Sequence, residues 1–467
     1  MNELTGRIEA IDAWVWQPFV MPLVLLIVGG WLSYRTGFVQ VRRFGTSVKM
    51  SLGGMFQKNE KEGTISSFQA LSTALAATVG NGNIGGVATA ILIGGPGAIF
   101  WMWMVATVGM ATKYSEAVLG VHFRVRTAAG ELASGPMYYI QNGIPNKTIG
   151  KWLAMAFAFF GMCAALFGTG NMAQSNTVAR TFVSAMDSIF KIQVSTWVPG
   201  LLITVAVGLV LLGGIKRIAA TAEKLVPAMI VLYLLTTFAF ILLNIVELPG
   251  VLLTIVTEAF TPTSAVGGFA GASVAKAIQI GVSRGVLSNE AGLGSSPIAH
   301  GIADVKHPVE QGTVGVFEVW IDTIIVCTAT AFVILQSGLW TDVAFQGASG
   351  DLTAAALGTQ IPFATGIVAL CSFLFAFSTL IGWCYYGEKC FEFMFGSSLV
   401  KAYRALFVAL IMVGSVVSVP LVWALGTLLN GFMALPNLIG LAFLSGTVAK
   451  LTADYFSGRK EMSVKDI

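Results

Sequence analysis

The segment Val79-Gly80-Asn81-Gly82-Asn83 places glycines and amide side chains inside an otherwise apolar stretch. A helix interrupted there would free carbonyls on its first half and N–H groups on its second half, and these two ends carry opposite partial charges. Such a break can hold a carboxylate and a cation without any charged side chain. Close helix packing through small residues is the alternative, although packing does not require two asparagines.

A second segment with mixed character runs from Ser283 to Gly301, with the sequence SRGVLSNEAGLGSSPIAHG. It contains a proline, several glycines and the ionisable residues Arg284 and Glu290, yet it is too apolar for an ordinary cytoplasmic loop. We expect an unwound centre between two half-helices. Two alternatives remain open: the helix ends at Arg284 and a loop follows, or the break lies at 267–271.

Further polar residues lie inside apolar runs. Gln174 can both donate and accept hydrogen bonds, which makes it a candidate for direct substrate contact or, alternatively, for an interhelical clasp. Glu318 and Asp322 are one helical turn apart. Together with Arg284 and Glu290 they are candidate gates, proton sites or coupling groups, because ionisable residues within membrane spans are usually functional. Structural ion pairs explain them equally well.

These residues must be positioned by membrane-spanning helices. The chain has 467 residues, of which 55% are hydrophobic and 11% charged, and its mean hydropathy is +0.79; a soluble domain carries about 25% charged residues. A spanning helix needs about 20 mostly apolar residues, and the runs lack the alternation of a membrane β-barrel. We predict about eleven spans, at 14–34, 66–94, 97–120, 151–177, 197–213, 218–246, 266–304 (interrupted), 312–338, 359–389, 402–418 and 420–447.

The spacing of the two breaks predicts an internal repeat. With 14–34 set aside as an extra N-terminal helix, the breaks fall in helices one and six of a ten-helix core. Five helices per repeat is an odd number, so the second repeat must be inverted and the two breaks meet near the middle of the membrane. We therefore expect one domain over 1–467, with a first repeat at 66–246, a second at 266–447 and a tail at 448–467.

Charge placement predicts the orientation of the chain. The net charge of +4 does not indicate a nucleic-acid partner. Basic residues cluster in every second loop. By the positive-inside rule, these loops are cytoplasmic. We therefore expect a multi-pass protein of the cell (inner) membrane. Its N-terminus is outside and its C-terminal tail is in the cytoplasm. The first span lacks a basic leader, so we expect it to be retained. The basic residues are Arg35, Arg42, Arg43, Lys49, Lys58 and Lys61 after the first span, His122, Arg124, Arg126 and Lys147 after the third, and Lys216 and Arg217 after the fifth.

Four motifs give the sequence a family resemblance. They are FQALSTALAATVGNGNIGGVATA, GGPGAIFWMWMVATVGMATKYSEA, GVSRGVLSNEAGLGSSPIAHG and STLIGWCYYGEKCFE. Together they resemble the alanine or glycine:cation symporter family (sodium:alanine symporters), from about Ser66 to Leu441. The resemblance implies an all-α fold similar to that of the bacterial leucine transporter, with broken core helices one and six. It also implies uptake of alanine and glycine coupled to Na⁺, or in some members to H⁺.

The resemblance further implies roles for individual residues. Backbone amides at Gly80, Asn81, Gly82 and Asn83 would bind the substrate carboxylate, with Thr78 facing the same cavity. The acidic residue that amine transporters place on core helix one is missing, because Ala76 and Ala77 stand there. Carbonyls around Leu287, Ser288, Asn289 and Glu290 would then bind the amino group. Trp383 lies on the same helical face as Thr379 and could cap the pocket and limit substrate size. Ordinary packing or anchoring at the membrane interface is the alternative for Trp383.

A sodium site is implied in the same way. The hydroxyl pair Ser378 and Thr379 on core helix eight would bind Na⁺ together with carbonyls of Ala76, Val79 and Phe375. Na⁺ is a hard cation that prefers oxygen ligands, which agrees with this set. Against it, adjacent hydroxyls in a membrane helix often bond to their own backbone carbonyls. No second sodium site is evident, so we expect one ion per cycle.

Other classes of function fit the sequence less well. A channel needs a continuous polar lining or a charge ring, whereas the polar clusters here are isolated. An enzyme is not expected, because the three histidines are scattered and no nucleophile or metal-ligand motif occurs. The five cysteines lie in or beside predicted spans and are expected to be free thiols. We expect no cofactor besides Na⁺ as the coupling ion, and alanine, glycine and the lipid bilayer as partners; the oligomeric state is not predicted.

Overall fold

The computed structural model describes residues 2–56, 65–127, 130–260, 274–345, 349–417 and 419–458. The alternative break at 267–271, the start of the expected 266–304 span and the last part of the expected tail lie outside these ranges. Within them, the chain is almost entirely helical, and the strands are only two residues long. β1 (Ile65–Ser66) pairs in parallel with β4 (Ala303–Asp304), and β2 (Val125–Arg126) pairs antiparallel with β3 (Leu132–Ala133).

Most helices of the first half coincide with expected spans, apart from interruptions within 66–94 and 151–177. The expected helix at 14–34 is corrected, because the non-helical residues 16–20 divide it between α1 and α2. Short elements between them, such as α3 and α4, were not expected from the sequence. The first half contains α1 (Asn2–Val15), α2 (Met21–Arg35), α3 (Val39–Arg42), α4 (Phe44–Gly53), α5 (Ser67–Thr78), η2 (Gly82–Gly86), α6 (Val87–Gly94), α7 (Gly97–His122), α8 (Pro136–Gly143), α9 (Lys147–Phe167), α10 (Met172–Phe190), α11 (Trp197–Leu211), α12 (Gly214–Leu243) and α13 (Leu248–Glu258).

The second half begins, within the described residues, at α14. It contains α14 (Val274–Asn289), α15 (Pro297–His300), α16 (Pro308–Val319), the π-helix η4 (Trp320–Cys327), α17 (Thr328–Ser337), α18 (Ser349–Gly358), α19 (Ala364–Phe395), α20 (Val400–Val416) and α21 (Val419–Phe456). One-turn 3₁₀ segments occur at Gly54–Phe56, Ile245–Glu247, Leu339–Thr341, Val343–Phe345 and Ser397–Leu399.

The protein is a multi-pass membrane protein. In the described residues, six helices are long and apolar enough to span a bilayer, and the bent pair Ser67–Thr78 and Gly82–Gly94 makes a seventh. Large apolar side chains point outward on these helices; Leu235 and Leu242 of α12, for example, are 66% and 67% exposed. An outer surface of this kind suits contact with lipid chains. The total of eleven spans stays a prediction.

Local sequence signals explain where several helices begin. Ser66 accepts a hydrogen bond from the N–H of Gln69, whose side chain accepts from the N–H of Ser66, so a capping box starts α5. Asn146 accepts from two backbone N–H groups and starts α9 in a similar way. At α16, Pro308 occupies the first turn, where its missing N–H costs nothing.

The expected span at 151–177 is not a continuous helix, which corrects the sequence analysis. The chain leaves helical geometry between α9 and α10, at residues 168–171. Close packing explains the glycines there, because a Cβ on Gly168 would lie 3.0 Å from the Cα of Gly426, and one on Gly170 would lie 2.6 Å from the Trp383 ring. Gln174 consequently lies in the first turn of α10.

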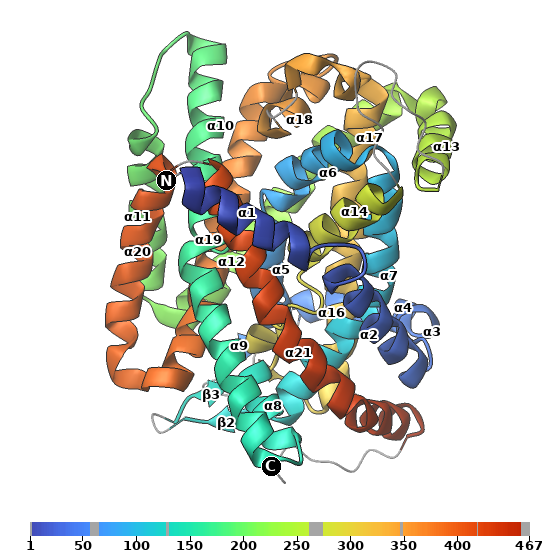
Figure 1. Ribbon diagram of the computed structural model, residues 1–467, viewed down its shortest axis with the longest axis vertical. Coiled ribbons are helices and arrows are strands. Elements are labelled where there is room, and N and C mark those ends of the chain that lie inside the picture. Colours follow the sequence, from blue (N-terminus) through green and yellow to red (C-terminus); the bar gives the residue numbers. More distant parts are fainter. Residues whose placement is uncertain are drawn as a thin grey trace.

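Two groups of helices enclose the interrupted segments. α7 packs against α14 and α16, and α19 packs against α5, α9 and α10. A Cβ on Gly281 of α14 would lie 2.3 Å from the carbonyl oxygen of Ala98 in α7, so the two helix backbones are in direct contact. Figure 1 shows α21, in red, crossing the face of the bundle beside α1 and α2, with which it is in contact.

Candidate functional site

The first break lies where the sequence predicts it. α5 ends at Thr78, and η2 and α6 continue at 52° to it. The Asn83 side chain holds the turn together, because its Oδ1 accepts the N–H of Gly80 at 2.8 Å. Its Nδ2 donates to Asp322 Oδ1 at 2.7 Å. Gly80 is followed by a π-helical turn (η2), a distortion that is frequent at functional sites.

The second break is shorter than expected and lies later in the chain. Residues 283–289 are helical and belong to α14, so the unwound segment is 290–296, and the helix after it, α15, has only four residues. Glu290 adopts a left-handed conformation with φ +57°. Gly292 and Gly294, also at positive φ, both donate their N–H to Glu116 Oε1 at 3.1 Å. A buried carboxylate from α7 thus satisfies backbone groups that the break leaves unpaired.

The carboxylate of Asp322 links the first break to the last turn of α14, just before the second break. It accepts from Asn83 of the first break and, at 2.8 Å, from the hydroxyl of Ser288 at the end of α14. Thr323 donates to the same carboxylate at 2.7 Å. Asp322 belongs to η4 and is fully buried, so this contact is made in a dry environment where hydrogen bonds to charged groups are strong.

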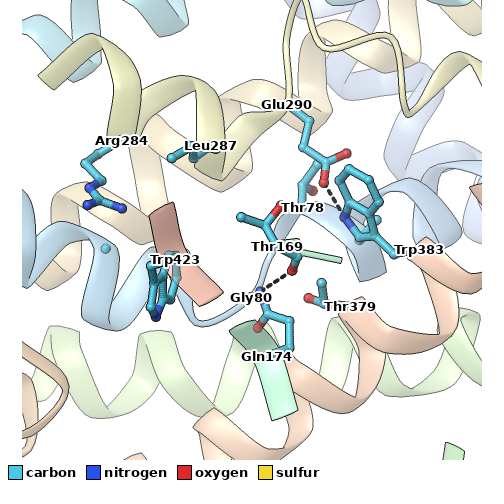
Figure 2. A pocket seen from close by; sticks show the side chains of 13 residues that line it. Thr78, Gly80, Thr169, Gln174, Arg284, Leu287, Glu290, Thr379, Trp383 and Trp423 are labelled. Carbon is cyan, nitrogen blue, oxygen red and sulfur yellow. Dashed lines mark hydrogen bonds between the residues drawn. The ribbon is translucent and has the colours of Figure 1, made fainter. Parts of the chain in front are cut away.

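A small cavity lies between the two breaks (Figure 2). Of the predicted substrate residues, Thr78, Gly80, Gly82, Gln174, Leu287 and Trp383 line it; Asn81, Asn83, Ser288 and Asn289 are buried beside it but are not in its lining. The candidate gate residues Arg284 and Glu290 also line the cavity, whereas Asp322 does not. The remaining lining residues are Thr379, one of the expected Na⁺ ligands, and four that were not predicted from the sequence, Ala77, Gly86, Thr169 and Trp423.

The polar groups of the cavity are held by specific contacts. Trp383 donates its ring N–H to Glu290 Oε1 at 2.7 Å, and Gln174 donates to the carbonyl of Thr169 at 3.2 Å (Figure 2). The Oε1 of Gln174 is buried and has no hydrogen-bond partner among the residues that the structure describes. The guanidinium of Arg284 lies 5.8 Å from the centre of the Trp423 ring, a cation–π distance.

Of the residues expected to bind Na⁺, Thr379 lines the cavity. Ser378 and Thr379 both donate to the carbonyl of Phe375, at 2.8 and 2.9 Å, as the alternative interpretation of the hydroxyl pair anticipated. A Cβ on Gly80 would lie 2.6 Å from Thr379 Oγ1, so the hydroxyl abuts the first break. Ala76 and Val79 are fully buried at the same end of α5. The donors are oxygens only, which suits Na⁺.

A transition-metal site is not found among the residues that the structure describes, because no group of three His, Cys, Asp or Glu side chains is suitably arranged there. The five cysteines are free thiols, as expected.

A buried ionic cluster, which the sequence analysis named only in part, lies next to the second break. Lys113 of α7 contacts Glu318 Oε1 at 3.1 Å and Ser296 at 2.7 Å. His300 of α15 contacts Glu318 Oε2 at 2.7 Å and Gln311 at 2.7 Å. Lys113, His300 and Glu318 are all fully buried. Lys113 was recognisable as a lysine inside the expected 97–120 span, but its partners come from other helices.

Solved structures with a similar fold are transporters. One is MhsT in complex with L-phenylalanine, with a TM-score of 0.56, 13% identity and coverage of 84% of this chain and 99% of that chain. Another is a manganese transporter from Eremococcus coleocola, with a TM-score of 0.53, 14% identity and coverage of 89% of both chains. Identities this low establish the fold alone. The fold is therefore that of a leucine-transporter-like helical bundle, with a cavity between two interrupted helices.

Sequence comparison identifies the family. The profile of the sodium:alanine symporter family matches residues 1–466. The sodium/alanine symporter AgcS of Methanococcus maripaludis is 44% identical over 462 residues, which cover 98% of both chains. The probable sodium/glutamine symporter GlnT of Bacillus subtilis is 39% identical over 449 residues, covering 96% of this chain and 89% of GlnT. The chain belongs to the sodium:alanine symporter family, and it is a Na⁺-coupled amino-acid symporter, not an enzyme.

Proposed function

We propose that this protein imports small neutral amino acids, alanine and glycine, together with Na⁺ by alternating access. The observation that carries the proposal is the cavity itself, which brings the first break, Gln174 and Trp383 together beside the hydroxyl of Thr379. A substrate and an ion placed there are close enough to stabilise each other's binding. This proximity supports coupling between them.

Of the four residues expected to offer backbone N–H groups, Gly80 donates to Asn83 Oδ1 and Asn83 donates to the carbonyl of Gly80. We therefore assign the substrate carboxylate to the N–H groups of Asn81 and Gly82, which open η2. The first N–H groups of a helix have no partner within it and carry partial positive charge. The buried oxygen of Gln174 accepts no hydrogen bond within the described ranges, so it is available to the substrate. Trp383 closes the cavity against the second break, which favours a substrate with a small side chain.

Na⁺ is assigned to the hydroxyls of Ser378 and Thr379 and to carbonyls of Ala76, Val79 and Phe375. Thr379 lies against Gly80, so an ion bound there would fix the end of α5 to α19. Alternating access then follows from Na⁺ and substrate stabilising one packing of the broken helices over another. One Na⁺ per cycle is proposed, as is the division into repeats at 66–246 and 266–447.

The proposed setting is the inner membrane, with the N-terminus outside and the C-terminus in the cytoplasm. A second candidate coupling ion is H⁺. It is favoured by Asp322, whose buried carboxylate has no cationic side chain within 4.0 Å among the described residues. Reconstituted protein distinguishes the two ions when uptake of radiolabelled alanine is driven by an imposed Na⁺ or H⁺ gradient in turn. We expect Na⁺ to drive concentrative uptake; equal uptake with choline replacing Na⁺ would refute the proposal.

A further inference from the structure

We propose that the carboxylate of Glu290 binds the amino group of the substrate, so that a side chain of the second break, and not its backbone carbonyls, selects for amino acids. This inference rests on the proposed function, since it assumes that an amino acid occupies the cavity. It replaces the missing acidic residue of core helix one with an acidic residue of core helix six.

Glu290 is the acidic residue of the cavity lining. Its left-handed backbone, with φ +57°, ends α14 and turns the chain at the start of the unwound segment. Figure 2 shows its carboxylate beside Trp383, on the side of the cavity away from Arg284. The side chain is 2% exposed, so its charge is removed from bulk water.

The carboxylate is held in place but keeps capacity for another partner. Trp383 donates to Oε1 at 2.7 Å, and Ser295 donates to Oε2. A carboxylate offers about four acceptor positions, so both oxygens can accept a further hydrogen bond. Two fixed donors orient the group without neutralising it.

Glu290 also has no cationic partner within 4.0 Å in the described part of the chain. The ammonium of Lys113 is bound to Glu318 and Ser296 instead. A buried charge without a counter-charge is costly. A substrate ammonium between Glu290 and Gly80 would supply that charge, while the substrate carboxylate faces the N–H groups of the first break. Alanine and glycine carry an ammonium and a carboxylate in this arrangement.

The test compares L-alanine with L-lactate, which has a hydroxyl in place of the ammonium. Inhibition of Na⁺-driven alanine uptake into proteoliposomes gives the affinity for each compound. Glu290→Gln keeps the size of the side chain and an acceptor for Trp383 but removes the charge. Glu131→Gln makes the same change at a side chain that is 64% exposed and serves as the matched control.

We expect Glu290→Gln to weaken the affinity for alanine about 10- to 100-fold. This range corresponds to the loss of one charge-assisted hydrogen bond. Lactate affinity and the half-saturating Na⁺ concentration should stay within about twofold, and Glu131→Gln should match the wild type. Equal weakening of alanine and lactate would indicate a structural role and overturn the proposal. Loss of Na⁺ dependence in Glu290→Gln would assign the residue to ion coupling and also overturn it.

Glu290→Asp gives an independent readout that covers a failure of Glu290→Gln to fold. Withdrawing the carboxylate by one methylene should weaken the affinity for alanine. It should also raise the affinity for N-methylalanine relative to that for alanine, because space opens at the amino group. An unchanged ratio would contradict the assignment. If the wild type itself shows no Na⁺-dependent alanine binding, the proposed function fails, and that result is distinct from failure of the role of Glu290.

Discussion

Gly80→Ala tests whether the first break must touch α19. A Cβ at this position would lie 2.6 Å from Thr379 Oγ1, about 0.8 Å inside the ordinary contact distance of 3.4 Å. Thr379 is itself fixed by its hydrogen bond to the carbonyl of Phe375. Accommodating the methyl group therefore requires a shift of the break or rotation of the hydroxyl away from the proposed Na⁺ site.

The expected cost follows from the packing. Overfilling a well-packed site costs about 1–3 kcal/mol, which corresponds to about 5- to 150-fold in an equilibrium constant. We expect the half-saturating Na⁺ concentration for alanine uptake to rise within that range. The assay is initial-rate uptake in proteoliposomes over a Na⁺ titration, with thermal unfolding in detergent measured on the same preparations. Gly30→Ala in α2, where no atom lies within 4 Å of the added Cβ, is the control.

The double variant Gly80→Ala/Thr379→Ala separates packing from ion binding. Removing the hydroxyl relieves the clash, so thermal stability should recover toward that of Thr379→Ala alone, while Na⁺ dependence stays impaired. Because the two sites are in contact, their effects should be non-additive. Unchanged Na⁺ affinity and unchanged stability in Gly80→Ala would refute the geometry of the break and the ion site that we base on it.

Three further predictions concern buried charges. Lys113→Met leaves Glu318 without its ammonium partner and should cost about 3–5 kcal/mol of stability. The unfolding temperature should fall, and adding Glu318→Gln should partly restore it. An unchanged unfolding temperature in Lys113→Met would show that the pair is not formed. Asp322→Asn removes the charge that accepts hydrogen bonds from the first break and from the end of α14. It should weaken alanine binding about tenfold or more, as measured by inhibition of uptake. Wild-type affinity for alanine would contradict the proposed role of these hydrogen bonds. Burial raises the pKa of the Asp12 carboxyl from 3.8 to about 6. Asp12 therefore destabilises the fold increasingly between these pH values, and Asp12→Asn should raise the unfolding temperature at pH 7.5 but not at pH 3.5; the reverse would show that the carboxylate is stabilised.

The breaks differ in how well the sequence predicts them. Val79–Asn83 combines glycine with two asparagines inside an apolar run. The side chain of Asn83 stabilises that turn locally, because it accepts the backbone N–H of Gly80. The second break was placed too early, because residues 283–289 form intact helix despite Gly285 and Arg284. The start of unwinding at Glu290 depends on Glu116, which belongs to α7 and binds the freed N–H groups of the break.

The cavity lining shows the same difference between local and distant signals. Thr78 and Gly80 stand at the break that is visible in the sequence, and Gln174 is visible as an amide side chain inside an apolar run. Trp423 lies on α21, where it is one apolar residue among many, and nothing local indicates that it reaches the cavity. The break at 168–171 was missed because its glycines serve contacts with Trp383 and Gly426, both far along the chain.

The sequence by itself determined that this protein is a polytopic helical membrane protein. It also determined where the first core helix breaks, at Val79–Asn83, and which family the motifs resemble. These properties depend on hydropathy and on backbone freedom over a few consecutive residues. Only the tertiary structure decided where the second break begins, and that Trp423 faces the same cavity as Glu290 and Trp383. It also decided that Asp322 links the first break to the end of α14. Partners of buried polar groups are chosen by helix packing across hundreds of residues, and no short segment encodes that choice.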